Sequence, residues 1–193
     1  PRYGSSAASD VYKRQNLQFH IQPISTDKLG GANLHDFHAF TPTVANIRPT
    51  SRGEISISSS DTKVNPKIKM NYLSTDEDRK VAADGIKLIR KIVMETNEFK
   101  KYEPEEFRPG SHLNEREEIV KACSHYAQTI FHPVGTCKMG NDESAVVSDK
   151  LKVHGINKLR VIDASIMPNI TSGNTNAPTI MIAEKGADMI LSA

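Results

Sequence analysis

The sequence predicts an α+β fold built from a mainly antiparallel sheet with flanking helices. Apolar residues alternate with polar ones in several short segments before residue 73, which is the period of a half-buried strand. After residue 74 the apolar residues recur instead at helical spacing. The composition agrees with a globular domain, since 37% of the residues are hydrophobic and 25% are charged. The formal net charge of +2 gives no indication of a nucleic-acid or membrane partner.

The first half of the chain contains the strand candidates. Leu17, Phe19 and Ile21 alternate with polar neighbours and predict the first strand. Residues 40–60 predict two strands joined by a turn at Pro49–Gly53, and residues 66–73 predict another short strand. Residues 1–15 differ from all of these, because they are small, polar and without pattern. We expect residues 1–15 to be a non-native or disordered leader.

A long helix is predicted over residues 74–96. Val81, Gly85 and Ile92 fall on one helical face together with Leu88. Ser74 precedes Glu77 by three residues, which is the pattern of a capping box at a helix start. Acidic residues fill the first turn, where they interact favourably with the helix dipole.

Two further helices are predicted nearer the C-terminus. Residues 114–130 have Asn114 as the expected cap, and this helix is expected to run directly into His132. The last helix is expected to start at Asn176 as its cap, with Pro178 in the first turn. Between these helices, residues 159–163 (LRVID) predict a short buried strand.

The cysteine and histidine spacings give no indication of a metal site. Cys123 and Cys137 are the only cysteines and form no CxxC motif, so free thiols are favoured over a single bridge. His35 and His38 have the i, i+3 spacing of two ligands on a helix but lack a third partner nearby. We therefore expect no bound metal.

His132 is the first candidate for catalysis. Proline follows it directly, and proline disfavours helical geometry in the residue that precedes it. The imidazole should therefore leave the predicted helix end in a defined direction. A fixed imidazole can act as a general base, but a histidine at a helix end also commonly serves as a cap or a packed ring. The residue alone leaves both interpretations open.

The turn before the last helix is the second candidate site. Asn174 and Asn176 bracket the predicted helix start, where unpaired N–H groups and the helix dipole favour an anion. Simple capping is the alternative explanation for these residues. Asp163 ends the predicted strand and is followed by the small residue Ala164. This pair suits either a ligand contact or the start of a turn.

Three blocks of the sequence occur together, in the same order, in a known family. Residues 132–140 (HPVGTCKMG), 159–168 (LRVIDASIMP) and 172–190 (SGNTNAPTIMIAEKGADMI) resemble the C-terminal part of the glucose–methanol–choline (GMC) oxidoreductases. Residues 46–59 and 66–92 are similar to the same family. The resemblance extends from Leu17 to the end of the chain, and it is strongest to the animal FAD-dependent glucose dehydrogenases, which use a quinone-type acceptor.

The resemblance implies an FAD-dependent oxidation of an alcohol or sugar hydroxyl. A proton would leave the substrate hydroxyl, and a hydride would pass to FAD from the carbon that carries this hydroxyl. His132 matches the family's base, and Asn174 matches the second catalytic position. The remaining matches fall on positions that would contact FAD: Asp163, Ala164, Asn176, Pro178 and Thr179.

The family's glycine-rich dinucleotide motif is missing from the sequence. None of the 11 glycines forms a GxGxxG, which in the family binds the ADP part of FAD. We therefore expect a C-terminal fragment, inactive alone, whose terminal strand and helix would join an FAD-binding domain absent from this chain. Its expected parts are residues 16–131 from the substrate domain and residues 132–193 as the catalytic and FAD-contacting segment.

The expected partners follow from the same resemblance. They are a small alcohol or sugar and an electron acceptor, either oxygen or a quinone-type compound. No nucleic acid and no membrane insertion is expected, and the resemblance suggests an extracellular location. The alternative is a cofactor-free binding or interaction domain that retains the fold without activity.

Overall fold

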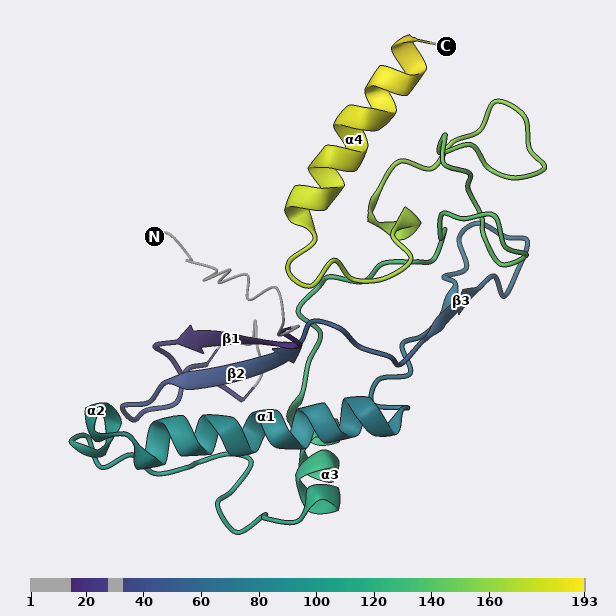
Figure 1. The fold of residues 1–193 in the computed structure, drawn as a ribbon. Coiled ribbons are helices and arrows are strands. Elements are labelled where there is room, and N and C mark those ends of the chain that lie inside the picture. Colours follow the sequence, from purple (N-terminus) through teal and green to yellow (C-terminus); the bar gives the residue numbers. More distant parts are fainter. Residues whose placement is uncertain (1–14, 28–32, 193) are drawn as a thin grey trace.

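The computed structural model describes residues 15–27 and 33–192, and it confirms the predicted α+β class (Figure 1). The expected leader, residues 1–15, lies outside the described residues except for its last position. In the described part of the chain, no helix is long and apolar enough to cross a membrane. The division of the chain into a substrate-domain part, residues 16–131, and a catalytic segment, residues 132–193, stays a prediction.

The strands form two separate antiparallel pairs within the described residues. β1 (Leu17–Gln22) pairs with β2 (Thr41–Asn46), and β3 (Glu54–Ser56) pairs with β4 (Lys67–Lys69). The prediction that a tight turn joins β2 to β3 is therefore wrong. The loop between β2 and β3 is held against the following long helix instead, because the backbone N–H groups of Thr50 and Ser51 donate to the Asp78 carboxylate in that helix.

The two faces of the β1–β2 pair have different neighbours. Phe19 lies opposite Val44, and the Val44 side chain lies against Gly85 of the long helix. Val44 of this face is in contact with the helix at Gly85, but Phe19 is 38% and Ile21 59% exposed. The apolar residues of β1 are thus less buried than the alternation predicts. The opposite face carries Gln18 and His20, which are half-buried and point away from the helix.

The long helix α1 (Asp76–Glu95) is confirmed, but its cap is Thr75 and not Ser74. The hydroxyl of Thr75 accepts a hydrogen bond from the Asp78 backbone N–H. The Asp78 side chain is 4% exposed and accepts hydrogen bonds from Asn46, Thr50 and Ser51. These bonds fix Asp78 in the third position of the helix, which makes Thr75 the residue that caps it.

The next helices are short. α2 (Asn97–Lys100) follows α1 directly, and α3 (Arg116–Tyr126) begins after Glu115, one residue later than predicted. The side chains of Glu115 and Glu118 form a reciprocal capping box, which explains that start.

The prediction that this helix continues to His132 is wrong, because α3 ends at Tyr126. Phe131 adopts a left-handed backbone conformation with φ of 63°, which a helix cannot continue through. The Phe131 N–H donates to the hydroxyl of Thr129, which stabilises this bend just before the histidine.

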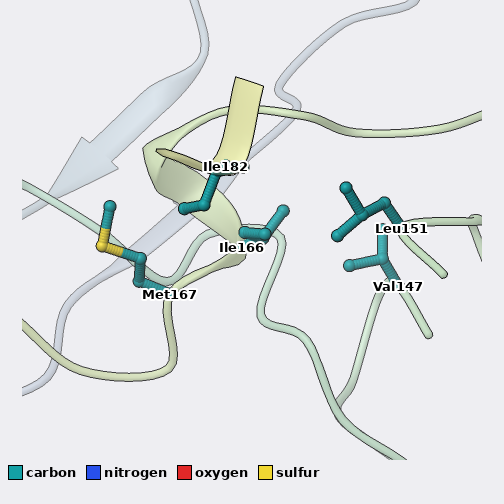
Figure 2. Packing of buried hydrophobic residues seen from close by; sticks show 5 residues of the cluster. All are labelled: Val147, Leu151, Ile166, Met167 and Ile182. Carbon is teal, nitrogen blue, oxygen red and sulfur yellow. The ribbon is translucent and has the colours of Figure 1, made fainter. Parts of the chain in front are cut away.

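The C-terminal region packs around a small buried cluster shown in Figure 2. The 3-10 helix η1 (Ala164–Ile166) and the last helix α4 (Asn176–Leu191) contribute Ile166 and Ile182. The loops on either side contribute the other members, which are Val147, Leu151 and Met167. α4 rises from this cluster with its first turn directed toward the β1–β2 pair (Figure 1).

The predicted strand over residues 159–163 does not form. The chain there makes one bridge, between Arg160 and Lys152, and no described strand lies beside it to extend a ladder. Asp163 instead caps η1, because its carboxylate accepts from the Ser165 N–H at 2.8 Å.

Candidate functional site

The segment that follows His132 is held by backbone contacts to η1. Gly135 has a φ of 89°, and a Cβ at this position would lie 3.3 Å from the Met167 carbonyl oxygen. Glycine is therefore required for this close approach. Two residues further on, the Cys137 N–H donates to the Ser165 carbonyl at 3.0 Å. The histidine is thus fixed between the bend at Phe131 and this backbone ladder.

The His132 ring lies half-buried against the start of α4. Its Nε2 is 2.7 Å from the side-chain Nδ2 of Asn174, and its Nδ1 is 3.0 Å from the Thr175 hydroxyl. Both ring nitrogens therefore have polar partners on neighbouring residues. The structure brings together the two residues that the sequence predicts to be catalytic, although they are separated by 42 positions.

Two partners of this pair do not follow from the sequence analysis. Thr175 is 7% exposed, and its hydroxyl contacts His132 instead of capping α4. Gln18 of β1 donates from its side-chain Nε2 to the Asn174 Oδ1 at 3.0 Å. The polar positions of β1, which alternate with its apolar ones, are the signal that could have identified Gln18.

The same strand face carries two buried atoms that have no hydrogen-bond partner among the described residues. They are the Oε1 of Gln18 and the Nε2 of His20. Buried polar atoms are nearly always paired, so each unpaired atom requires an explanation. Their place on the face that meets Asn174 indicates that this face is built for polar contacts and not for a core.

The first turn of α4 is open to an anionic ligand. Asn176 is the first helical residue and not the cap, because Thr175 occupies the capping position without a side-chain bond to the helix. The backbone N–H groups of Asn176 and Ala177 find no acceptor among the described residues, and no acidic residue occupies this turn. Pro178 has no N–H, and the Thr179 hydroxyl donates to the Thr175 carbonyl. The dipole at this end of the helix favours negative charge.

Asp163 and Ala164 lie apart from this group. The Asp163 carboxylate is occupied with capping η1, and within the described residues no hydrogen bond joins it to His132 or Asn174. Ala164 is packed against the buried cluster of the C-terminal region. Both residues support η1, which in turn contacts α4. Their predicted contact with FAD stays a prediction.

A mainly apolar cavity lies next to the loop that contains the histidine. Its volume is about 470 Å³, and its lining includes Met70, Tyr72, Phe131 and Pro133. Phe131 and Pro133 flank His132 in the chain, but His132, Asn174 and Thr175 are not among the lining residues.

The comparison with protein families identifies the chain. The family model described as GMC oxidoreductase matches residues 49–183, which is well over half of the sequence. The chain therefore belongs to the GMC oxidoreductases, as the sequence motifs predict.

Curated relatives and solved structures agree with this membership. The oxygen-dependent choline dehydrogenase of Proteus mirabilis (strain HI4320) is 44% identical over 187 residues, covering 97% of this chain and 33% of that protein. The chain thus spans about a third of the length of the curated relatives it matches. The finer resemblance to animal glucose dehydrogenases stays a prediction.

One of the structural neighbours is described with the expected cofactor. Pyridoxine 4-oxidase from Mesorbium loti superposes with a TM-score of 0.75 and 33% identity, over 81% of this chain and 30% of that one. Formate oxidase of Aspergillus oryzae RIB40, studied for its FAD modification, superposes with a TM-score of 0.75 and 32% identity, over 82% and 28%. FAD is therefore the cofactor of this family.

Proposed function

We propose that this chain supplies the hydroxyl-binding and proton-accepting residues of an FAD-dependent enzyme that oxidises an alcohol or sugar. The contact of 2.7 Å between His132 Nε2 and Asn174 Nδ2 carries this proposal. In this contact, Nε2 of His132 is the acceptor nitrogen and Nδ2 of Asn174 is the donor nitrogen. A hydroxyl group is both a donor and an acceptor, so it can replace this contact with two hydrogen bonds of its own.

His132 is proposed as the general base of the reaction. Its ring is fixed by Thr175 on one side and by the bend at Phe131 on the other. A positioned imidazole contributes about 10²–10⁴-fold to the rate of a proton transfer. Asn174 holds the same oxygen through its Nδ2, which keeps the hydroxyl proton directed at the ring and stabilises the alkoxide as it forms.

The start of α4 is proposed as the surface that faces the flavin. FAD, when bound, accepts the hydride from the substrate carbon. The N–H groups of Asn176 and Ala177 and the helix dipole would stabilise the negative charge that this transfer brings. Asn174, which binds the hydroxyl together with His132, lies two residues before Asn176 in the chain. This closeness supports one site with both roles.

The substrate class is proposed from the cavity and from the names of the relatives. Choline, pyridoxine and aryl alcohols are small molecules with a hydroxyl group, and they appear in the names of similar proteins. The cavity lined by Phe131 and Pro133, the residues that flank His132 in the chain, offers an apolar wall for the body of such an alcohol. The choline dehydrogenases are named as oxygen-dependent, and a quinone-type compound is the alternative electron acceptor.

The proposal is tested in a chimera in which this chain replaces the matching third of the Proteus mirabilis protein. The chimera is purified with its flavin, and the visible spectrum is followed without oxygen after addition of choline or another small alcohol. We expect the oxidised flavin band to bleach with at least one alcohol of the panel. A chimera that retains flavin but is bleached only by dithionite would favour the cofactor-independent binding role instead.

A further inference from the structure

We infer that Gln18 is a positioning residue that sets which nitrogen of His132 carries the proton. This inference deepens the proposed function, because it rests on His132 as the base of that reaction. Gln18 does not contact His132 itself. It acts through Asn174, whose side-chain amide lies between the two residues.

One orientation of the two amides pairs every donor with an acceptor along the chain of contacts. Gln18 Nε2 donates to Asn174 Oδ1 at 3.0 Å, and Asn174 Nδ2 donates to His132 Nε2 at 2.7 Å. The Nε2 atom must then be unprotonated, so the ring proton lies on Nδ1 and is donated to the Thr175 hydroxyl at 3.0 Å.

Turning both amides over produces the opposite arrangement. Asn174 then presents its oxygen to His132 and its NH₂ group to Gln18, which forces the proton onto Nε2. The backbone N–H of Thr175, 3.4 Å from Nδ1, favours this second arrangement. The contact between Asn174 and His132 Nε2, at 2.7 Å, is much shorter than the contact of 3.4 Å between the Thr175 N–H and Nδ1. The contact with Asn174 can form a hydrogen bond in either orientation of the amide.

The burial of Gln18 decides between the two. The Oε1 atom of Gln18 is buried and has no partner in residues 15–27 and 33–192. Turning the amide over would place an NH₂ group with two hydrogens in that same position, again without an acceptor. A buried donor without an acceptor costs the desolvation of that group, and leaving two hydrogens unpaired is worse than leaving one oxygen partly unpaired. The first orientation is therefore the stable one.

The consequence for the reaction is direct. In the first orientation, Nε2 offers a lone pair to a hydroxyl that replaces the Asn174 contact, and the ring can accept the proton. In the second, Nε2 already carries a proton and can only donate. Gln18, located 156 positions before Asn174 in the chain, thus determines whether the ring is ready to act as a base.

The test is the tautomer of His132, read by NMR from the ¹⁵N shifts and long-range couplings of the histidine rings. The chain has seven histidines, and the His132→Gln variant identifies the signals that belong to this ring. At a pH where the ring is neutral, we expect Nδ1 to be protonated and Nε2 to be bare. A proton on Nε2 in the unsubstituted chain would overturn the inference.

The Gln18→Glu variant supplies the decisive comparison. A carboxylate accepts hydrogen bonds and donates none, so Asn174 must turn its NH₂ group toward it and its oxygen toward His132. We therefore expect the proton to appear on Nε2 in this variant. A bare Nε2 in the Gln18→Glu variant would contradict the role of Gln18.

Two further variants keep the test informative if the buried carboxylate perturbs folding. Gln18→Leu removes the donor, so both tautomers should be populated, and a single unchanged tautomer would contradict the inference. Gln22→Glu places the same charge on the same face of β1, four residues away, and should leave the tautomer unchanged. Because the measurement needs neither flavin nor alcohol, its result is independent of whether the chimera reduces its flavin.

Discussion

Replacing Asp78 with asparagine should destabilise the chain strongly, because this side chain joins three segments. Its Oδ1 accepts from the Asn46 side chain and from Thr50, and its Oδ2 accepts from the Ser51 N–H at 2.8 Å. The residue is 4% exposed, so water cannot replace these bonds. The amide introduced by Asp78→Asn would keep one oxygen and turn its NH₂ group toward the N–H of Ser51.

The size of the effect follows from that one lost acceptor. A hydrogen bond to a charged group contributes about 1.5–3 kcal/mol, and the Ser51 N–H would be left without an acceptor. We therefore expect Asp78→Asn to lower the free energy of unfolding by about 2–3 kcal/mol at neutral pH. Asp84→Asn is the matched control, because Asp84 lies on the same helix with its side chain 54% exposed and forms an ion pair with Lys80. An exposed pair of this kind contributes at most about 1 kcal/mol.

The pH dependence supplies a second criterion for the same variant. Burial raises the pKa of Asp78, but the hydrogen bonds from Ser51 and Thr50 more than compensate, so its pKa lies below the ordinary value of 3.8. A lowered pKa in the folded state means that the stabilisation is present above the ordinary pKa and is lost as the pH falls through the folded pKa. The difference in stability between wild type and Asp78→Asn should therefore be largest at neutral pH and shrink as the pH falls below the ordinary carboxyl pKa of 3.8.

Urea unfolding followed by circular dichroism measures both quantities. The two variants are compared with wild type at neutral pH and again in acid. Equal stabilities for Asp78→Asn and Asp84→Asn at neutral pH, or a difference that persists unchanged in acid, would refute the reasoning.

Three further predictions concern the packing of the scaffold. A Cβ at Gly186 would approach the Ile162 side chain too closely, so Gly186→Ala should lower the free energy of unfolding by about 1–3 kcal/mol. A second substitution, Ile162→Ala, should restore part of this loss, and purely additive losses would contradict the prediction. Glu106 accepts two hydrogen bonds from the Arg90 guanidinium, at 2.8 and 2.9 Å. Glu106→Gln should therefore lower the free energy of unfolding in urea by about 1–3 kcal/mol and increase the cleavage of residues 101–115 in limited proteolysis. Unchanged cleavage would count against this prediction. Burial raises the pKa of the Cys123 thiol, so this cysteine should react more slowly with a disulfide reagent in the folded chain than in urea, and equal rates would argue against that burial.

The local patterns of the sequence identify most of the helices and strands, but not what surrounds them. The alternation in β1 predicts a strand, and the strand forms, but Phe19 and Ile21 remain exposed. Which residues cover the other face depends on a segment more than 150 positions away, as the bond from Gln18 to Asn174 shows. No local pattern carries that information.

The helix starts illustrate the same limit at shorter range. Both Ser74 and Asn114 fit the rules for a cap, yet the helices begin one residue later in each case. For α1 the choice is made by Asp78, which is held by a loop that precedes the helix by more than 20 residues. Propensity thus identifies the helix, and tertiary hydrogen bonds choose its first residue.

The candidate site is predicted in part for a related reason. His132 and Asn174 stand out through the motifs that contain them, and the structure places them in contact. Thr175 escapes the sequence analysis because a threonine next to a helix start is explained by capping alone. The structure shows that its hydroxyl is used differently, as a partner of the His132 ring.

The rate of flavin reduction in the chimera, measured without oxygen by stopped flow, tests the central proposal most directly. His132→Gln is compared with His154→Gln, whose exposed ring is hydrogen-bonded to the Gly140 carbonyl and, in the described part of the chain, to neither His132 nor Asn174. If His132 is the base, its substitution should slow reduction by the alcohol by about 10²–10⁴-fold while His154→Gln leaves the rate unchanged. Equal rates in the two variants, with flavin retained in both, would contradict the assignment of His132 as the proton acceptor.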